Sequence, residues 1–436
     1  MSWFKKTSIL ALALALMVAL VACGTDETTE PDDGEEPIGT VSVMGVWGGD
    51  EIAAFEEVVA AWESETGGTM EFEGTRDLSA ILRARVSGGN PPDLVILPNP
   101  ALLQDFAASG DLIALDGVLD MGQVRADHSD AWIDLGTVDG NLYGLFIKAA
   151  TKSTVWYNPG NFADAGYEIP ETWDELVTLS EQMLADGTAP WSIGIESGGA
   201  TGWAATDWIA EILLAESGPD VYDQWVAHEI PWTDPAIKSA FEKFGVMALT
   251  DGFVPGGADG ILATGFEEAS YLPFQDPPQA HMYFLGSFTQ GFIANQFPDL
   301  VPEEDYDFFK FPYVDPAYTG AATGGADVAA MFNDTPSARS LMNYLADGAS
   351  WESWAAAGGY ASPNRSLDPS VYPDVLAAKA AEQLTESAIF RFGAGDLMPS
   401  EVQNAFWNAT IDYLQQPGNL DTILGDVEAV AAEAYE

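Results

Sequence analysis

Short apolar runs that alternate with helical patterns are the feature that most constrains the fold of this 436-residue chain. Residues 41–47 and 93–97 have the pattern of buried strands, because each is a short, mainly apolar run. Between them, apolar residues recur at helical spacing at Ile52, Phe55, Val58, Val59 and Trp62. Because such strand and helix units repeat along the chain, the sequence predicts an α/β fold with a mostly parallel sheet.

The first residues of three later helices are also recognisable. Thr172 and Glu175 have the spacing of a capping box, and Gly187 is suited to end the same helix. Asp234-Pro235 and Thr335-Pro336 mark two further starts, because proline fits the first turn of a helix. About 400 residues follow the N-terminal region, which is more than one hydrophobic core usually supports, so we expect two lobes.

The N-terminus has the pattern of a secretory signal, with Lys5 and Lys6 before an apolar run at 9–22. The run is shorter than the roughly 20 residues that cross a bilayer. It ends in Leu20-Val21-Ala22-Cys23, which is similar to a lipobox, so we expect a lipoprotein signal peptide at 1–22 and lipidation of Cys23. The alternative is an ordinary signal peptide with a chance cysteine.

Residues 23–39 are acidic and almost free of apolar side chains. Such a segment cannot bury enough surface to offset the entropy of ordering it, which predicts a flexible tether. Lipid chains on Cys23 would then hold the protein at the membrane surface.

The chain carries 68 acidic and 15 basic residues, a formal net charge of −53. This excess argues against nucleic acid as a partner, since nucleic-acid binding needs a basic surface, and against adsorption on anionic lipid. Two interpretations stay open: a cationic ligand such as a polyamine, or an acidic surface that keeps the protein in solution in a salty habitat. The acids are spread along the whole chain, which favours the second.

Few residues could hold a metal or form a covalent bridge. Cys23 is the single cysteine of the sequence, so no disulfide is expected. The histidines His128, His228 and His281 are far apart and lack partners at helical spacing, so we expect no metal site and no histidine-based catalytic site. The sequence has no phosphate-binding loop of the nucleotide-binding types, and no cofactor is predicted.

Aromatic residues are abundant, with 14 tryptophans and 14 tyrosines. Several stand beside glycine and polar residues in expected loops: Trp47-Gly48-Gly49-Asp50, Gly202-Trp203, Asp207-Trp208 and Ala405-Phe406-Trp407. Each of them could instead be a core residue. Together they suit a sugar site, where sugar rings stack on flat aromatic side chains while a few polar groups take the hydroxyls.

A series of short segments also occurs in a characteristic order. These segments are Val46-Trp47-Gly48-Gly49, Gly89-Asn90-Pro91-Pro92-Asp93-Leu94-Val95, Gly140-Asn141-Leu142-Tyr143-Gly144, Val155-Trp156-Tyr157-Asn158, Ala165-Gly166-Tyr167-Glu168-Ile169-Pro170-Glu171-Thr172-Trp173-Asp174-Glu175-Leu176 and Leu397-Met398-Pro399. Their order resembles that of ABC-transporter extracellular solute-binding proteins of the maltose-binding (family 1) type, over nearly all of the chain after the leader.

Within that family, three further segments are most similar to those of α-glucoside-binding proteins. They are Ile193-Gly194-Ile195-Glu196-Ser197-Gly198, Thr201-Gly202-Trp203-Ala204-Ala205-Thr206-Asp207-Trp208 and Phe274-Gln275-Asp276-Pro277-Pro278.

The resemblance implies a periplasmic-binding-protein-like fold of type II, in which two α/β lobes joined by a multi-segment hinge close on a ligand cleft. The expected N-terminal lobe comprises residues 40–147 and 315–345, and the C-terminal lobe comprises residues 148–314 and 346–436. Crossings between the lobes are expected near residues 146–152, 309–314 and 345–350. The resemblance also leads us to expect a monomer.

The family's binding positions, carried over residue by residue, supply candidate ligand-binding residues on both sides of the cleft. From the first lobe and the first crossing they are Trp47, Gly48, Gly49, Asp50, Arg76, Asp77, Asn99, Lys148, Lys152 and Asp327. From the second lobe they are Glu196, Trp203, Asp207, Gly286, Ser287, Phe288 and Trp407. Asn99 stands where the family often has an aromatic residue and an acid, and Phe288 replaces a tryptophan.

The polar candidates also have structural interpretations. Arg76 and Asp77 could form a surface ion pair of little energetic weight. Lys148 and Lys152 could stabilise the hinge, and Glu196 could cap a strand end.

These features together predict a lipid-anchored, extracytoplasmic solute-binding protein that captures a sugar and delivers it to the permease subunits of an ABC importer. The resemblance points to an α-glucoside such as maltose, sucrose or trehalose, with no enzymatic activity. A surface-anchored glycoside hydrolase is the alternative from another class, since 68 acids leave room for the two carboxylates that such enzymes need. Among binding proteins, the rival ligands are a polyamine, a peptide and a metal ion.

Overall fold

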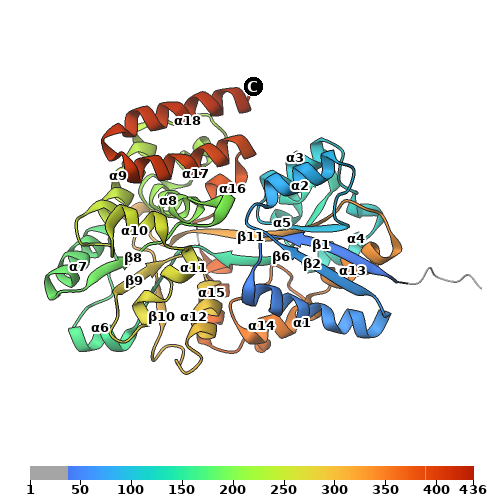
Figure 1. The fold of residues 1–436 in the computed structure, drawn as a ribbon, viewed down its shortest axis with the longest axis horizontal. Helices are drawn as coiled ribbons and strands as arrows, with labels where there is room; N and C mark the ends of the chain where they lie inside the picture. Colours follow the sequence, from blue (N-terminus) through green and yellow to red (C-terminus); the bar gives the residue numbers. More distant parts are fainter. Residues whose placement is uncertain (1–37, 388) are drawn as a thin grey trace, which may run out of the picture. The chain divides into compact units, whose positions relative to one another are not determined.

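The apolar runs of the sequence form two separate sheets in the computed structural model, which describes residues 38–387 and 389–436 (Figure 1). Within these ranges, the first sheet has six strands in the order β12-β11-β3-β1-β2, with β6 also paired to β11. They are β1 (Thr40–Gly45), β2 (Thr69–Gly74), β3 (Leu94–Leu97), β6 (Gly144–Thr151), β11 (Ala321–Met331) and β12 (Ile389–Phe392). The second sheet has the order β10-β7-β9-β8, formed by β7 (Thr154–Tyr157), β8 (Ala189–Ser192), β9 (Ala280–Phe284) and β10 (Asp307–Lys310). A separate ribbon pairs β4 (Thr137–Val138) with β5 (Asn141–Leu142).

Both sheets are mixed, whereas the sequence predicted a mostly parallel sheet. In the first sheet β1 is parallel to β2 and β3, but β11 runs antiparallel to β3 and β6. In the second sheet β8 and β9 are parallel, while β7 is antiparallel to both of its neighbours. The reason is that the chain leaves the first lobe along β6 and returns to it along β11, so these two paired strands run in opposite directions. β7 and β10 are related in the same way in the second sheet, where the chain enters along β7 and leaves along β10.

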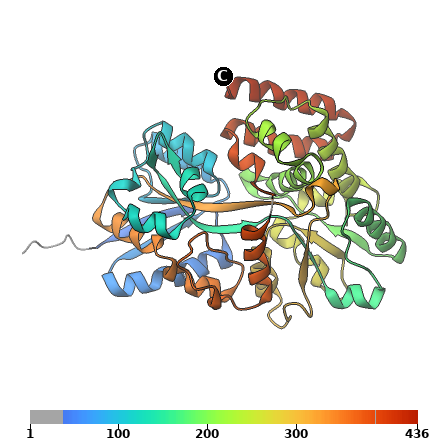
Figure 2. The ribbon, with the colours of Figure 1, turned by 180° about the vertical axis from the view of Figure 1, so that it is seen from behind.

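Helices cover both sheets (Figures 1 and 2). The first sheet packs with α1 (Gly49–Thr66), α2 (Leu78–Ser87), α3 (Pro100–Ala108), α4 (Met121–Asp127), α5 (Asp130–Leu135), α13 (Pro336–Ala346) and α14 (Glu352–Ala357). The second sheet packs with α6 (Pro159–Ala165), α7 (Trp173–Asp186), α8 (Trp203–Val226), α9 (Pro235–Leu249), α10 (Gly257–Ala263), α11 (Phe266–Ala269), α12 (Thr289–Gln296), α16 (Ala394–Leu397), α17 (Ser400–Gln415) and α18 (Leu420–Ala434). α15 (Val375–Glu386) lies against β6 and β11.

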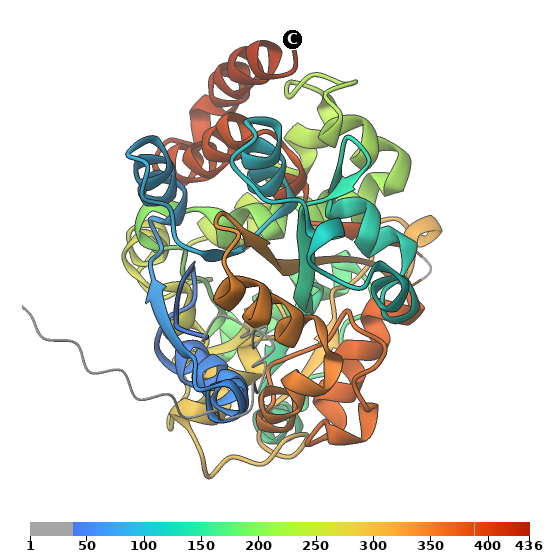
Figure 3. The same ribbon diagram turned by 90° about the vertical axis from the view of Figure 1, so that its right-hand side faces the viewer.

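The first sheet is buried on both faces, which explains why β3 is an unbroken apolar run. Successive side chains of a strand point to opposite faces. Val43 and Ile96 accordingly join one hydrophobic cluster, and Met44 and Val95 join another. α1 and α14 lie on one face, and α2 and α3 lie on the other (Figures 1 and 3). We call this sheet with its helices the first lobe, and the second sheet with its large cluster the second lobe; both belong to one compact unit.

The chain passes between the lobes at residues 152–153, between β6 and β7, and at residues 311–320, between β10 and β11. Both passages overlap the segments where crossings were predicted. Glu211 of α8 holds the two together, because its buried carboxylate accepts hydrogen bonds from Ser153 Oγ at 2.7 Å and Thr323 Oγ1 at 2.6 Å.

The third crossing does not lie at residues 345–350. Trp351, Trp354, Tyr360 and Leu367 pack in the cluster of the first lobe, and the rings of Trp351 and Tyr360 stack 5.5 Å apart. The chain joins the second-lobe cluster only at Leu376 of α15. We therefore propose that the first lobe extends through residue 367, beyond the boundary at 345 that the sequence suggested.

The predicted helix signals are confirmed. Thr172 and Glu175 make both hydrogen bonds of a capping box at the start of α7, and Gly187 ends that helix with a φ of 104°. Pro235 begins α9 and Pro336 begins α13, and the preceding residue caps each helix with its side chain.

The predicted signal peptide at 1–22, the predicted lipidation site Cys23 and the tether as far as residue 37 lie outside the described residues. Among the helices of residues 38–387 and 389–436, none has the combination of length and apolar composition needed to cross a membrane.

Candidate ligand-binding cleft

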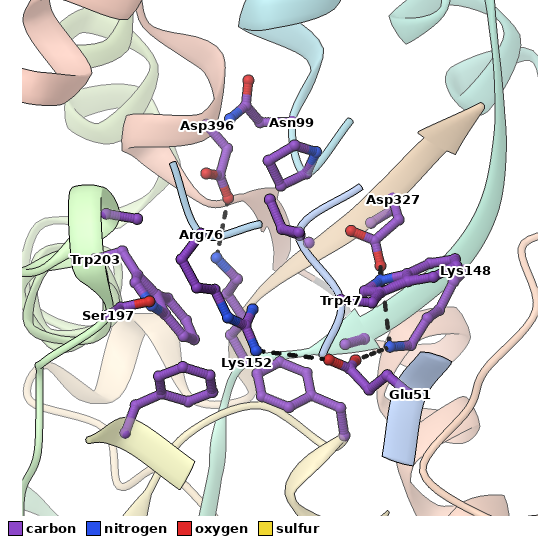
Figure 4. Close-up of a pocket in the computed structure, with 18 of the residues that line it drawn as sticks. Trp47, Glu51, Arg76, Asn99, Lys148, Lys152, Ser197, Trp203, Asp327 and Asp396 are labelled. Carbon is purple, nitrogen blue, oxygen red and sulfur yellow. Dashed lines mark hydrogen bonds and ion pairs between the residues drawn. The ribbon is translucent and has the colours of Figure 1, made fainter. Parts of the chain in front are cut away.

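A cavity with an empty volume of about 910 Å³ lies between the two lobes (Figure 4). From the first lobe it is lined by Val46, Trp47, Glu51, Arg76, Pro98, Asn99, Lys148, Ala149, Ala150, Gly325, Ala326 and Asp327. From the second lobe and the first crossing it is lined by Lys152, Ser197, Ala200, Trp203, Phe266, Phe288, Phe292, Asp396 and Trp407.

Strand direction brings the first-lobe side chains together. β1, β2 and β3 are parallel, so the loops after their carboxyl ends meet at one edge of the sheet, where α/β folds bind ligands. Trp47 follows β1, Arg76 follows β2 and Asn99 follows β3. Asn99 is fixed there because its Oδ1 caps α3 by accepting a hydrogen bond from Leu102 N at 2.9 Å.

Lys148 of β6 is surrounded by two carboxylates and two indole rings. Its Nζ donates to Glu51 Oε1 at 2.7 Å and lies 3.9 Å from Asp327 Oδ2. The same atom is 4.7 Å from the ring centroid of Trp354 and 5.4 Å from that of Trp47. Trp47 Nε1 in turn donates to Asp327 Oδ2 at 3.0 Å. Burial raises the pKa of Asp327 to about 6, against the charge of Lys148 that favours the ionised form.

Lys152, at the first crossing, is also held by two carboxylates. Its Nζ donates to Asp207 Oδ1 at 2.8 Å and to Asp396 Oδ2 at 2.9 Å. Gln403 Nε2 donates to the other oxygen of Asp396 at 3.2 Å. Burial would lower the pKa of Lys152, but the two carboxylates outweigh burial and raise it. Burial raises the pKa of Asp207 to about 6, although the nearby Lys152 opposes that change.

Four rings of the second lobe form an aromatic wall along the cavity: Trp203, Phe266, Phe288 and Phe292. Neighbouring ring centroids are 5.0 to 6.3 Å apart. Arg76 reaches this wall from the first lobe, with its guanidinium carbon 4.9 Å from the centroid of Phe266. The wall therefore presents apolar ring surface opposite the charged groups of the first lobe.

Nine of the predicted site residues line the cavity, and they come from both lobes. They are Trp47, Arg76, Asn99, Lys148, Lys152, Trp203, Phe288, Asp327 and Trp407.

The other eight predicted residues do not line it: Gly48, Gly49, Asp50, Asp77, Glu196, Asp207, Gly286 and Ser287. Several of them lie outside the cavity and contact residues that line it. Asp207 holds Lys152, and Gly286 leaves room for the ring of Phe288, which passes 2.6 Å from where a Cβ of residue 286 would stand. Glu196 accepts a hydrogen bond from the backbone of its own loop at 2.9 Å.

The remaining residues of that group lie at helix starts or make backbone hydrogen bonds next to the site. Gly48 precedes α1, which begins with Gly49 and Asp50, and Asp77 directly precedes α2. The backbone N–H of Ser287 donates to Thr151 O at 2.8 Å.

Sequence reasoning missed several lining side chains. Glu51 directly follows the predicted loop that ends at Asp50, and Asp396 precedes the segment Leu397-Met398-Pro399, so wider windows would have included both. Ser197 directly follows the predicted residue Glu196 in a segment that the resemblance had marked, whereas Phe266 and Phe292 have no comparable local signal. In the described ranges, no group of three or more His, Cys, Asp or Glu side chains is arranged to hold a metal ion.

Comparison with known proteins places these observations in a family context. The family model for bacterial extracellular solute-binding proteins matches residues 48–349. The chain is 37% identical to the osmoprotective compounds-binding protein GgtB of Synechocystis sp., over 95% of this chain and 96% of that protein. It is 36% identical to the alpha-glucosides-binding periplasmic protein AglE of Rhizobium meliloti, over 88% of this chain and 86% of that protein.

Solved structures show the same fold. The bacterial solute receptor AcbH superposes with a TM-score of 0.80 at 21% identity, covering 91% of this chain and 100% of its own. A chitin oligosaccharide binding protein superposes with a TM-score of 0.79 at 20% identity, covering 91% and 98%. These matches confirm the predicted two-lobed fold of type II.

Proposed function

The chain belongs to the family of bacterial extracellular solute-binding proteins, and we propose that its cleft captures a small neutral α-glucoside for an ABC importer. The observation that carries this proposal is the aromatic wall of one lobe facing ion-paired polar side chains of the other. A sugar ring has an apolar C–H face and a rim of hydroxyl groups, and this arrangement offers a partner to each.

The polar groups support a neutral ligand. The charged residues that line the cavity are the cations Arg76, Lys148 and Lys152 and the anions Glu51, Asp327 and Asp396. Because each of the three lining anions forms an ion pair with a lysine, a polyamine would meet no lining carboxylate without a cationic partner. Hydroxyl groups, which both donate and accept hydrogen bonds, can bind beside either sign of charge.

The relatives narrow the class of sugar. One is named for alpha-glucosides and the other for osmoprotective compounds, and each covers most of this chain. Neutral α-glucosides such as trehalose and sucrose satisfy both descriptions, and maltose satisfies the first.

Isothermal titration calorimetry of residues 38–436 with maltose, sucrose, trehalose and spermidine tests the proposal. We expect micromolar or tighter binding of at least one disaccharide and no heat with spermidine. Binding of spermidine alone would overturn the sugar proposal in favour of a cationic solute.

The same samples separate binding from hydrolysis. The protein is incubated with each bound disaccharide, and the products are separated by anion-exchange chromatography. We expect the disaccharide to be recovered intact, because the carboxylates of the cavity are engaged by Lys148 and Lys152. Release of monosaccharide that requires the protein would instead favour a glycoside hydrolase.

We also propose that Cys23 is lipidated, that the protein acts as a monomer outside the cytoplasmic membrane, and that it delivers its ligand to permease subunits. The sequence Leu20-Val21-Ala22-Cys23 supports the anchor. In cells, wild type should fractionate with membranes and incorporate radiolabelled palmitate, while Cys23→Ser should do neither. Equal membrane association of both proteins would contradict the anchor.

A further inference from the structure

Ser197 has a buried hydroxyl group that the fold leaves unused. It lies in the turn between β8 and α8 and lines the cavity, although only 4% of the residue is exposed. Among the described residues its Oγ has no hydrogen-bond partner. Leaving a buried polar group unpaired costs about 1–3 kcal/mol, so native proteins keep few of them.

The backbone around this hydroxyl is fully engaged. The N–H of Ser197 donates to Thr201 Oγ1 at 3.0 Å, and its carbonyl accepts from Ala200 N at 3.0 Å. The preceding residue donates to Thr264 O at 3.1 Å. The turn is therefore fixed from both sides, and the hydroxyl is the polar group of Ser197 that can still bind a partner.

Arg76 of the first lobe lies opposite the turn that holds Ser197. A Cβ built on Gly198 would lie 3.4 Å from Arg76 Cβ, so the two loops are in contact across the cleft. Figure 4 shows Ser197 beside Trp203, on the side of the cavity that Arg76 reaches. A guanidinium group can only donate hydrogen bonds, whereas a serine hydroxyl can donate and accept.

We infer that Ser197 determines ligand specificity by binding one hydroxyl group of the sugar ring that stacks on the aromatic wall. This inference rests on the proposed function and names a residue of the same site. Arg76 can donate to that ligand hydroxyl, which then donates to Ser197 Oγ from the other lobe. A ligand lacking this hydroxyl would leave Ser197 Oγ unpaired in a closed site, whereas Arg76 would keep Glu51 at 3.9 Å as a partner. Unpaired buried groups of this kind are how polar sites discriminate strongly.

The test combines Ser197→Ala with monodeoxy analogues of the disaccharide that wild type binds best. Calorimetry should show that wild type loses affinity for one analogue in particular. Ser197→Ala should bind the parent sugar about 3- to 10-fold more weakly. It should discriminate against that analogue less than wild type does, because the hydrogen bond from Arg76 to the ligand hydroxyl remains. The matched control is Thr289→Val, which removes another unpartnered buried hydroxyl, at a residue that does not line the cavity. It should retain the affinities of wild type.

The outcomes separate the two proposals. If wild type binds no saccharide, the proposed function fails and this inference fails with it. If wild type binds a disaccharide but discriminates against no monodeoxy analogue, the inference alone is wrong, whether or not Ser197→Ala folds. It is also wrong if Ser197→Ala retains the discrimination of wild type. Thermal melting of both variants shows whether an altered affinity reflects altered folding.

Discussion

The position of Lys152 depends on the absence of a side chain at Gly325 of β11. A Cβ added to Gly325 would stand 2.8 Å from Lys152 Cε, well inside van der Waals contact. Because Cε lies near the far end of a flexible side chain, the lysine would move aside, and its Nζ would shift from Asp207 Oδ1 at 2.8 Å and Asp396 Oδ2 at 2.9 Å. A methyl group at this one glycine should therefore alter the position of a cation that lines the cavity.

We predict that Gly325→Ala weakens sugar binding by about 3- to 10-fold, or about 0.7–1.4 kcal/mol, because Lys152 Nζ no longer holds its wild-type position in the cavity. Titration calorimetry provides the measurement. Gly425→Ala in α18 is the control, because a Cβ there meets no atom within 4 Å, and it should bind as wild type does. Unchanged affinity of a folded Gly325→Ala would show that Lys152 does not shape the site.

The titration of Asp327 should be visible in the stability of the protein. Burial raises the pKa of this carboxyl group from 3.8 to about 6, so the folded state holds its proton more tightly than the unfolded state. The protonated carboxyl group of Asp327 therefore contributes to stability below about pH 4, and this contribution is lost as the pH rises through about 6. Urea unfolding measures the effect. As the pH rises from about 4 to about 6, the free energy of unfolding of Asp327→Asn should increase by about 1–3 kcal/mol relative to that of wild type.

Asp334→Asn is the control of opposite sign. The hydrogen bond from Arg339 lowers the pKa of Asp334, so this exposed residue stabilises the fold above its unfolded pKa and loses that effect as the pH falls. Its variant should therefore lose stability relative to wild type at neutral pH. Parallel pH profiles for wild type and Asp327→Asn would refute the assignment to Asp327.

Single residues of the site could be predicted where the chain carries a local signal. Trp203 stands out because it follows a glycine at the start of α8, whereas the family resemblance marked Lys148, Asp327 and Trp407, the last of which lies within α17. Phe266 could not be found in this way, because it reaches the aromatic wall only when α11 packs on the second sheet. Asp207 was placed in the right region, but its role is to hold Lys152 from behind.

Among the elements, α7 offers a clean test of a helix cap. Thr172 Oγ1 accepts from Glu175 N at 3.2 Å, and Glu175 accepts from Thr172 N at 3.1 Å. Thr172→Ala should reduce the free energy of unfolding by about 1 kcal/mol, as N-cap losses typically do. Chemical unfolding measures this directly. Because neither Thr172 nor any other residue of α7 lines the cavity, sugar affinity should stay at the wild-type value, and a parallel loss of affinity would contradict this separation.

Helices and strands could be predicted where short sequence patterns determine their position. They were harder to predict where packing determines it. The strands of the first sheet and the starts of α7, α9 and α13 follow from short patterns in the sequence. The third crossing does not, because the tryptophans at 351 and 354 fit either hydrophobic core by pattern alone. Trp351 stacks on Tyr360, Trp354 lies tilted against the same ring, and all three residues pack in the hydrophobic cluster of the first lobe. Strand direction was also mispredicted, since it depends on connections between the lobes.

At the scale of the whole molecule, chain length predicted two lobes and the resemblance predicted the cleft between them. Neither predicted how closely the lobes meet. Ser400 Oγ of the second lobe donates to Asp105 Oδ2 of the first at 2.6 Å, and Arg76 lies over Phe266. Such contacts join residues hundreds of positions apart, so they follow from the assembled fold and not from any local pattern.

The net charge of −53 should make the stability of the whole protein depend on salt. Repulsion among like charges disfavours the compact state, and salt weakens it by shortening the Debye length from about 30 Å at 0.01 M to about 3 Å at 1 M. The cations are few, with 15 lysines and arginines against 68 acids, so repulsion among the acids is balanced only in small part by attraction to cations. We therefore expect the thermal midpoint at pH 7 to rise steadily with sodium chloride over that range.

The pH provides the control for this prediction, because salts also act on apolar surface. Near the sequence pI of about 4.1 the chain carries little net charge, so screening has little repulsion to remove. The rise in thermal midpoint with salt should then shrink strongly, whereas an effect of salt on apolar surface would persist at both pH values. Calorimetric scans at pH 7 and pH 4, each from low to high salt, distinguish the two. Equal salt dependence at both would show that the acidic surface does not limit the stability of the folded protein.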